Sequence, residues 1–435
     1  MPAPVSPADT QASADVELLA SLEAVPPGAA LPPAIEQTLA IPSINVREKA
    51  LPVRPGDLTR LLLAQPGLSA EEHDGLARFG PLLGAVFHNE FYERIRELKE
   101  LYAPLDPDSD YVKLADHSRV RTERSDEEFL PPFRATMNRA NYRQLDVEVI
   151  QEAVEAPNEL GLTYQPNFAQ FEHLQVFVRG YTKLPRVFRS MRTRFRKRTV
   201  WLDAYQRMVV LLKFKDDPKL DPYVRSDVIY LRMFKDVPHV DMEMHLPEQG
   251  TRVKMRWIDK AQIASPMVTG LPTLIYKLLY AAALNPLILI PMLIAPISAG
   301  INSFFGFQRA KHKHLSSMIR NLYYLTLANN GSVLTRIIDS AEEEEYKETM
   351  LAYFFLWRAS VGGEQLSGKE LDHKIEAFLR DVSGIELNFD IGDALGKLFR
   401  LGLADRDESG ALRVLGVQEA LAQLDHRWDN AFHYA

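Results

Sequence analysis

The longest uncharged stretch of this chain constrains its fold more than any other feature. Between Lys277 and Arg309, 31 residues carry no charged side chain, and most of them are apolar. One helix needs about 20 residues to cross a bilayer, so this stretch is longer than one helix requires. Extended back to Ile263, it contains only Lys277 as an interruption. The pattern predicts two membrane-spanning helices.

The dipeptide Asn285-Pro286 divides this stretch, because Asn-Pro favours a turn and ends a helix at the residue before the proline. Residues 263–284 and 286–307 then form halves of 22 residues each. Each half would be about 33 Å long, enough for the hydrocarbon core of a bilayer. Cations flank the stretch on both outer sides, and such flanks face the cytoplasm. We therefore predict a transmembrane helical hairpin at 263–307, with a re-entrant hairpin as the alternative.

The remaining composition is that of folded domains. Charged residues make up 25% and hydrophobic residues 46% of the 435 positions, which is ordinary for globular proteins. The chain has no cysteine, so disulfides, thiolate metal ligands and cysteine nucleophiles are excluded. Residues 1–46 contain eight prolines, five acidic residues and no Lys or Arg. This composition predicts a disordered acidic tail over residues 1–50 rather than a signal peptide.

Residues 51–260 are predicted to form one soluble α+β domain. Apolar residues recur every three or four positions over 70–102, as in an amphipathic helix. The period then changes, and Val, Tyr and Phe become frequent in three segments, 171–181, 199–215 and 227–235. These segments are typical of β-strands.

A basic run at 183–198 holds eight cations and no acidic residue. The cations are Lys183, Arg186, Arg189, Arg192, Arg194, Arg196, Lys197 and Arg198. They would give a helix or a long hairpin loop a strongly positive charge. Anionic lipid headgroups attract each such cation by about 1 kcal/mol, whereas nucleic-acid phosphates and solvated or paired charges are the alternatives. Because apolar residues alternate with the cations, we favour a lipid- or anion-binding interfacial segment.

A short motif occurs twice, 20 residues apart. Its first copy is Phe214, Lys215, Asp216, Pro218 and Asp221, and its second is Phe234, Lys235, Asp236, Pro238 and Asp241. The repeat predicts two adjacent strands that each end in a matching turn at one edge of a sheet. The alternative is a chemical role, in which the two Lys/Asp pairs bind a phosphate or a headgroup.

A possible metal-ligand pattern follows the second copy. On a strand, alternation would place His239, Asp241, Glu243 and His245 on one face. Two imidazoles and two carboxylates resemble a ligand set for zinc or a non-haem metal. Residues on one face of a strand are about 6.6 Å apart, however, so one straight strand cannot bring all four to one ion. We therefore predict no metal and no cofactor.

Residues 308–345 are expected to form a helical connector. Ser340 is a suitable helix N-cap, and the glutamates at 342–345 would then occupy the first turn, beside the positive end of the helix dipole. This placement predicts a solvated acidic turn, with a cation site as the alternative.

Residues 346–435 show the pattern of a winged helix. Ser367 and Glu370 form a capping box, a later helix ends at Gly402, and a hairpin turn follows at 408–410. These residues hold 10 Lys and Arg against 15 Asp and Glu, a net charge of −5. Such a charge repels nucleic-acid phosphates. A protein-interaction or dimerisation role is therefore expected here.

Three segments carry a resemblance to a known family: FKDVPHVDMEM at 234–244, LYYLTLANNGSVLTRIIDSAEEEE at 322–345 and LAYFFLW at 351–357. With the apolar stretch between them they resemble the transmembrane protein 143 family, a domain of unknown function. The resemblance covers roughly residues 85 to 435 and implies a paired membrane segment. It implies no reaction, so no catalytic residue can be transferred, and His239 and His245 are not part of the family pattern.

Enzymatic signatures are missing from the sequence, which has no Gly-rich phosphate loop, G-x-S-x-G elbow or His-Glu-x-x-His helix. The expected fold is α+β, with an N-terminal α+β domain, a two-helix transmembrane hairpin and a C-terminal winged-helix-like domain. The expected function is a membrane-anchored interaction or scaffold protein of the bacterial inner membrane, with both termini cytoplasmic. Its expected partners are membrane lipids and an unidentified protein or a second copy of the chain. The alternative is a membrane-bound enzyme or lipid-handling protein that uses the repeated motif.

Overall fold

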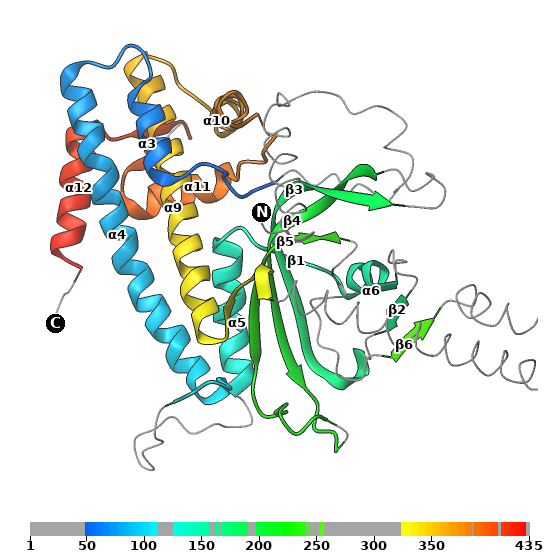
Figure 1. Cartoon of the computed structure of the whole chain (residues 1–435). Coiled ribbons are helices and arrows are strands. Elements are labelled where there is room, and N and C mark those ends of the chain that lie inside the picture. Colours follow the sequence, from blue (N-terminus) through cyan, green and yellow to red (C-terminus); the bar gives the residue numbers. More distant parts are fainter. Residues whose placement is uncertain are drawn as a thin grey trace, which may run out of the picture.

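A helical body lies beside a long, twisted antiparallel sheet (Figure 1). The computed structural model describes residues 48–110, 125–155, 162–165, 168–189, 197–218, 220–239, 242, 252–255, 323–384, 386–407 and 410–431. The helices of the body are α3 (Pro55–Leu63), α4 (Ala70–Tyr102), α5 (Ser125–Arg139), α9 (Gly331–Val361), α10 (Gly368–Ser383), α11 (Ile391–Leu401) and α12 (Val417–Asp429). Short 3-10 helices lie at Ala103–Leu105, directly after α4, and at Phe168–Gln170.

The main sheet has five strands in the order β1-β3-β4-β5-β7. They are β1 (Arg143–Gln144), β3 (Phe171–Arg189), β4 (Lys197–Phe214), β5 (Tyr230–Pro238) and β7 (Thr326–Asn329). Strands β3 and β4 form one long hairpin that pairs from Phe171 and Phe214 at its base to Arg189 and Lys197 at its tip. Two small ladders join β2 (Leu162–Gln165) to β6 (Arg252–Met255) and β8 (Ala404–Arg406) to β9 (Leu412–Val414).

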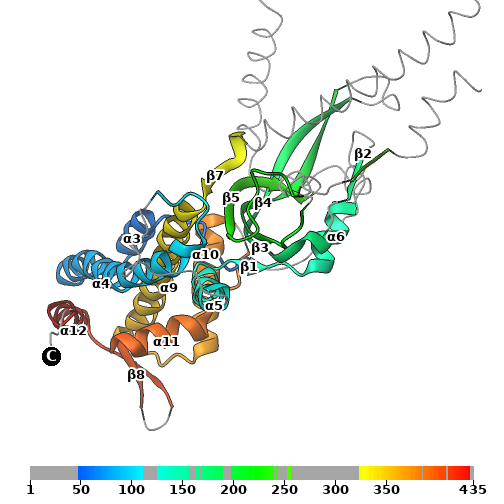
Figure 2. The same ribbon diagram turned by 90° about the horizontal axis from the view of Figure 1, so that it is seen from below.

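Alternation along the strands gives the sheet two apolar faces. Phe177 and Val209 belong to the core shared with the helical body. Their chain neighbours Val178 and Val210 lie in a second core on the opposite face, as expected because successive side chains of a strand point to opposite sides. Helix α6 (Val147–Glu155) covers this second core, and Figure 2 shows the sheet between α6 and the other helices.

Helix α4 confirms the helix predicted over 70–102 and is the longest element of the body. It begins with a capping box, in which the Ser69 hydroxyl accepts from the backbone of Glu72 and the Glu72 carboxylate accepts from the backbone of Ser69. Its buried face includes Phe79, whose ring stacks on that of Tyr353 in α9 at a centroid distance of 4.3 Å. Burial of such large rings against α9 and α12 stabilises the body by about 1.5 to 3 kcal/mol per side chain.

The predicted transmembrane hairpin at 263–307 lies outside the residues that the structure describes. Among those that are described, no helix combines the length and the apolar character needed to cross a membrane. Helices α4 and α9 have 33 and 31 residues, but charged residues recur along both and their apolar faces pack on each other. This finding contradicts the expected fold with a transmembrane hairpin and the expected integral membrane location. The described fold is a mixed α+β structure.

The connector expected at 308–345 is not one helix where it is described. Residues 326–329 form β7, which pairs with β5 at the edge of the sheet. Helix α9 then begins at Gly331, after Asn330 adopts a positive φ of 48°. Ser340 is therefore inside α9, where its hydroxyl donates to the carbonyl of Arg336. The prediction that Ser340 caps a helix is wrong, and the acidic residues at 342–345 lie in the middle of α9.

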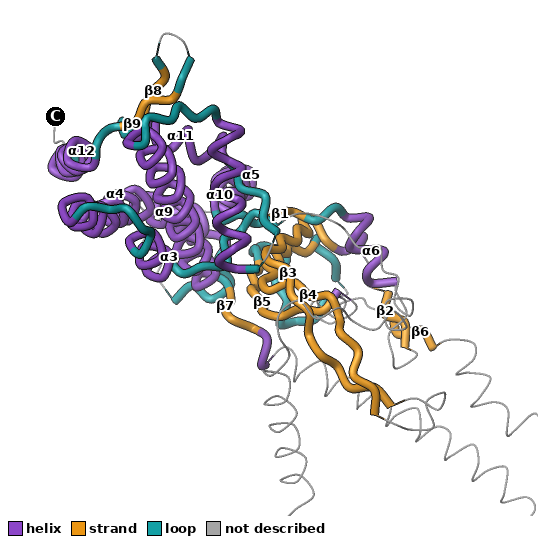
Figure 3. The backbone as a smooth tube through the Cα atoms, turned by 90° about the horizontal axis from the view of Figure 1, so that it is seen from above, coloured by secondary structure: helices purple, strands orange, loops and turns teal. Residues whose placement is uncertain are grey.

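The C-terminal elements appear in the predicted order. The Ser367 capping box opens α10, and Gly402 ends α11 in the left-handed region at a φ of 72°. The hairpin of β8 and β9 projects from the body (Figure 3). Side chains of α10, α11 and this hairpin belong to the same core as α4 and α9. The domain boundaries drawn from the sequence stay a prediction.

Candidate functional site

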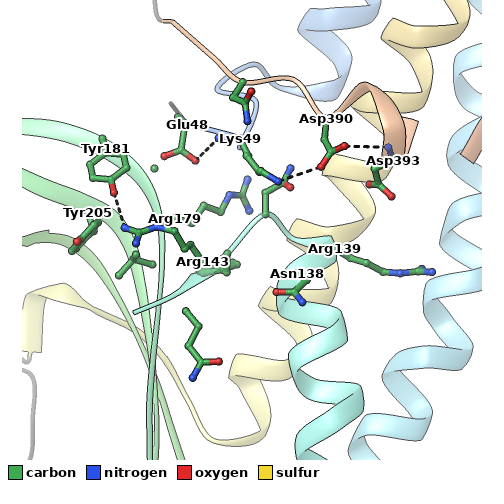
Figure 4. Close-up of a pocket in the computed structure, with 16 residues that line it drawn as sticks. Glu48, Lys49, Asn138, Arg139, Arg143, Arg179, Tyr181, Tyr205, Asp390 and Asp393 are labelled. Atoms are coloured by element: carbon green, nitrogen blue, oxygen red, sulfur yellow. Dashed lines mark hydrogen bonds and ion pairs between the residues drawn. The ribbon is translucent and has the colours of Figure 1, made fainter. Parts of the chain in front are cut away.

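A cavity of about 820 Å³ lies where the helical body meets the sheet (Figure 4). We call it the junction pocket. Its wall is formed by Glu48, Lys49, Asn138, Arg139, Asn141, Tyr142, Arg143, Gln144, Val178, Arg179, Gly180, Tyr181, Tyr205, Asn388, Asp390 and Asp393. Four of these side chains are cationic, three are carboxylates and three are tyrosines, so the wall is strongly polar.

Two backbone features bring the cations to this wall. Asn141 adopts a φ of 57°, which turns the chain sharply from α5 into β1 and places Arg139 and Arg143 on either side of the turn. On β3, Gly180 has a φ of 72° beside Arg179. A Cβ atom at Gly180 would lie 2.5 Å from Oε1 of Gln206, so this position requires glycine for both conformation and space.

The sheet side of the pocket includes Arg143 and three tyrosines. Nη2 of Arg143 donates to the Tyr181 hydroxyl at 2.8 Å. Burial raises the pKa of Tyr205 to about 12 even though Arg143 opposes the shift. Tyr142 is only 4% exposed, and its hydroxyl has no hydrogen-bond partner within the part of the chain that the structure describes. Among the described residues, Arg143 forms no ion pair with a carboxylate.

Carboxylates on the helix side already have partners. Nζ of Lys49 lies 3.2 Å from Oδ2 of Asp390, and Asp390 also caps α11 by accepting from the backbone of Asp393. Burial raises the pKa of Asp390, but these two contacts outweigh it and lower the pKa overall. Glu48 accepts from the backbone of Ala50 at 3.0 Å, and burial raises the pKa of its carboxyl.

A group of buried ionic side chains lies behind the pocket wall. We call it the charge layer: Glu344, Glu345, Lys347 and Glu348 of α9 and Lys397 of α11. Each of these residues is at most 4% exposed. The prediction of a solvated acidic turn at 342–345 is therefore wrong for Glu344 and Glu345. Buried charges require partners, and every member of the charge layer has one.

The pocket wall and the charge layer share hydrogen bonds. Nδ2 of Asn141 donates to Oε1 of Glu348 at 2.7 Å and to Oε2 of Glu344 at 3.1 Å. Nη2 of Arg179 donates to Oε1 of Glu344 at 2.7 Å. On a third wall residue, Nε of Arg139 lies 3.4 Å from Oε1 of Glu345. Two cations of the pocket, Arg139 and Arg179, are therefore held in place by carboxylates that are themselves buried.

Lysines complete the charge layer. Nζ of Lys347 donates to Oε1 of Glu344 at 2.6 Å and to the carbonyl of Leu51 at 2.7 Å. Lys397 forms a short ion pair with Glu348. Burial raises the pKa of Glu348 to about 7, against the opposing effects of Lys397 and Asn141. Glu348 is thus a carboxyl group that titrates near neutral pH.

A second ionic group lies elsewhere between α5 and the sheet. We call it the Lys213 cluster: Asp126, Glu172, His173 and Lys213. One ligand atom each from Asp126, Glu172 and His173 lies within 4.8 Å of the others, a spacing that would suit a metal ion. Nζ of Lys213, however, hydrogen-bonds to Asp126 and lies 2.9 Å from Oε2 of Glu172. The ammonium group therefore takes the place that a metal cation would need.

The basic run is partly described, and its described part belongs to the hairpin of β3 and β4 rather than to a helix. Lys183 is exposed and Arg186 is half-buried on β3. Arg189 ends β3, and Lys197 and Arg198 open β4 at the paired tip. The other predicted cations, Arg192, Arg194 and Arg196, lie outside the described residues. None of the described cations of this run lines the junction pocket, and their lipid- or anion-binding role stays a prediction.

The repeated motif lies on adjacent strands, but its two copies occupy different positions. Phe214 ends β4, and Lys215, Asp216, Pro218 and Asp221 follow in the connection to β5. Phe234, Lys235, Asp236 and Pro238 lie within β5. Because β4 and β5 are antiparallel, the copies lie toward opposite ends of the paired strands. The prediction of matching turns at one edge is therefore wrong, and a joint role of both copies in chemistry has little support.

Of the predicted metal pattern, only His239 is described; Asp241, Glu243 and His245 lie outside the described residues. The His239 ring packs on that of Tyr205 at a centroid distance of 4.1 Å. Burial lowers the pKa of His239, which favours its neutral form. His239 thus packs beside the sheet side of the junction pocket.

One family comparison bears on this site. The family model matches residues 205–332, and the family is described as a protein of unknown function (DUF3754). This match supports the expected domain of unknown function. The matched segment begins at Tyr205 on the pocket wall and ends in the first turn of α9, so it excludes Arg143 and Arg179. No solved structure matches the chain.

Proposed function

We propose that this protein binds a small anionic ligand in the junction pocket. The observation that carries the proposal is Arg143, a pocket-wall guanidinium that contacts a tyrosine hydroxyl and has no carboxylate partner among the described residues. Lys49, Arg139 and Arg179 add positive charge to the same wall. The planar guanidinium matches carboxylate and phosphate groups through paired hydrogen bonds.

The size and the remaining polar groups of the pocket support a small ligand. A volume of about 820 Å³ is within the range of small-molecule sites, roughly 300 to 1,000 Å³. The buried hydroxyl of Tyr142 has no hydrogen-bond partner among the described residues, and such a group is unfavourable unless something hydrogen-bonds to it. A ligand oxygen would satisfy this hydroxyl while an anionic group bonds to Arg143.

The proposal is tested by isothermal titration calorimetry with sulfate, at constant ionic strength, on the full chain. Arg143→Ala is expected to weaken sulfate binding at least tenfold, because a charge-assisted hydrogen bond contributes about 1.5 to 3 kcal/mol. Arg78→Ala is the matched control, since Arg78 is an exposed arginine of α4 that pairs with Asp74. Absence of sulfate binding by the unmodified protein, or equal weakening by both variants, would contradict the proposal.

A second candidate function is the protein-interaction or scaffold role predicted from the sequence. The observation that favours it is Trp428 on α12, which is 43% exposed beside a hollow of about 370 Å³ that Glu90 and Arg427 also line. Exposed tryptophans often anchor protein interfaces. For this candidate we also propose that the chain belongs to the transmembrane protein 143 family. Light scattering of the full chain and of Trp428→Ser would test self-association.

A further inference from the structure

A ligand in the junction pocket and the carboxylates of the charge layer would compete for the same hydrogen-bond donors. Arg179 donates to Glu344, and Asn141 donates to both Glu344 and Glu348. From these shared contacts we infer that anion binding in the junction pocket is coupled to proton uptake by the charge layer, chiefly at Glu348. This inference rests on the proposed anion-binding function and adds its regulation by pH.

The first step of the coupling is the sharing of arginines. A bound anion next to Arg179 or Arg139 draws each guanidinium away from the glutamate that now pairs with it. Arg179 is 2.7 Å from Glu344, and Arg139 is 3.4 Å from Glu345. The charge layer then has less positive charge around it, which favours proton uptake at Glu348.

The second step is the charge balance around α9. The charged groups that face this part of the helix from its neighbours are Glu90 and Arg94 of α4, Arg139 of α5, Arg179 of β3, and Asp393, Lys397 and Arg400 of α11. Together with Glu344, Glu345, Lys347 and Glu348 of α9, these groups carry a net charge of about +1. A bound sulfate, which carries two negative charges, therefore leaves one negative charge in excess, and one bound proton removes it.

Glu348 is the group best placed to take that proton. Burial raises the pKa of its carboxyl to about 7, so both protonation states are accessible near neutral pH. Below this pH the layer has one negative charge fewer and attracts an anion more strongly; above it, the ionised Glu348 repels the anion. Two further titratable groups adjoin the pocket: Glu48 in its wall and His239 packed on Tyr205. Burial raises the pKa of Glu48 and lowers that of His239.

The test is calorimetric titration of the full chain with sulfate at about pH 6 and about pH 8. Sulfate keeps both charges throughout this range, so its own titration cannot cause a difference. We expect binding to be about three- to tenfold tighter at the lower pH, as a charge interaction over about 10 Å would give. Titration in two buffers of different ionisation enthalpy should show net proton uptake near pH 7.

Two glutamine variants separate the carboxyl groups. Glu348→Gln keeps the side-chain shape and removes the titration, so sulfate binding should become nearly independent of pH, whereas Glu48→Gln should retain the dependence. Loss of the dependence in Glu48→Gln alone would overturn the assignment. If Glu348→Gln does not fold, proton uptake by the unmodified protein decides. Equal affinity at both pH values without proton uptake would overturn the coupling but leave the anion site standing, and no sulfate binding at either pH would overturn both.

Discussion

The charge layer and the Lys213 cluster are two answers to the same physical problem, which is how to keep carboxylates inside a protein. In each, a lysine lies between carboxylates: Lys397 beside Glu348, and Lys213 between Asp126 and Glu172. The Lys213 cluster is closed, because its ammonium occupies the space between its own carboxylates. The charge layer is open, because its glutamates also hold Arg179 and Asn141 of the pocket wall. Only the open arrangement can exchange partners with a ligand.

Removal of Lys397 from the charge layer should have the largest effect. Lys397→Met leaves Glu348 buried without its cation and should lower the free energy of unfolding by about 3 to 5 kcal/mol, measured by urea denaturation at about pH 8. The double variant Lys397→Met with Glu348→Gln should recover most of this loss, since it removes the unpaired charge as well. A loss below about 1 kcal/mol in the single variant would show that the layer is solvated.

The dependence of stability on pH separates the two groups next. Because the pKa of Glu348 is about 7 in the folded protein and near 4.3 when unfolded, the folded state binds this proton more tightly. The stability that Glu348 contributes is present below about pH 4.3 and is lost as the pH rises to about 7, by about 4 kcal/mol in total. The difference between unfolding free energies of the unmodified protein and Glu348→Gln should show this slope. A constant difference across that range would contradict it.

Opening the closed group should turn it into a metal site. Lys213→Ala leaves Asp126 without its main cation and should cost about 2 kcal/mol, less than in the charge layer because Glu172 is half exposed. The vacated space then has two carboxylates and one imidazole around it, so Zn²⁺ should restore the thermal stability. Zn²⁺ should stabilise neither the unmodified protein nor the variant that also carries His173→Ala. Equal responses of all three proteins would rule out this site.

Much of the fold could be predicted from the sequence, because local periodicity determines it. The apolar spacing over 70–102 predicts α4, and the aromatic and β-branched segments at 171–181, 199–215 and 227–235 identify β3, β4 and β5. The capping box at Ser367 likewise marks the start of α10. Each of these signals depends only on neighbours within a few residues.

The candidate site could not be predicted in this way. Arg143 and Arg179 are ordinary strand cations in the sequence, and only tertiary contacts bring them together with Asp390. The sequence around Glu344 predicts a solvated acidic turn, because the pattern does not indicate strand β7 and suggests a helix start at Ser340 rather than at Gly331. Two hydrogen-bond partners of Glu344, Arg179 and Asn141, are more than a hundred residues away in the sequence.

The smallest effect is predicted for an exposed ion pair, which is the reference for the buried ion pairs. Arg96 and Glu93 form an ion pair of 2.7 Å on α4, with side chains that are 65% and 52% exposed. An exposed pair three residues apart on a helix contributes about 0.3 kcal/mol, because water and salt screen it and the flexible side chains lose freedom when they pair. Arg96→Ala should therefore change the free energy of unfolding by less than about 0.5 kcal/mol in urea denaturation, and added salt should reduce even that change. If Arg96→Ala cost as much as Lys397→Met, charge removal alone would explain both results and burial would not distinguish them.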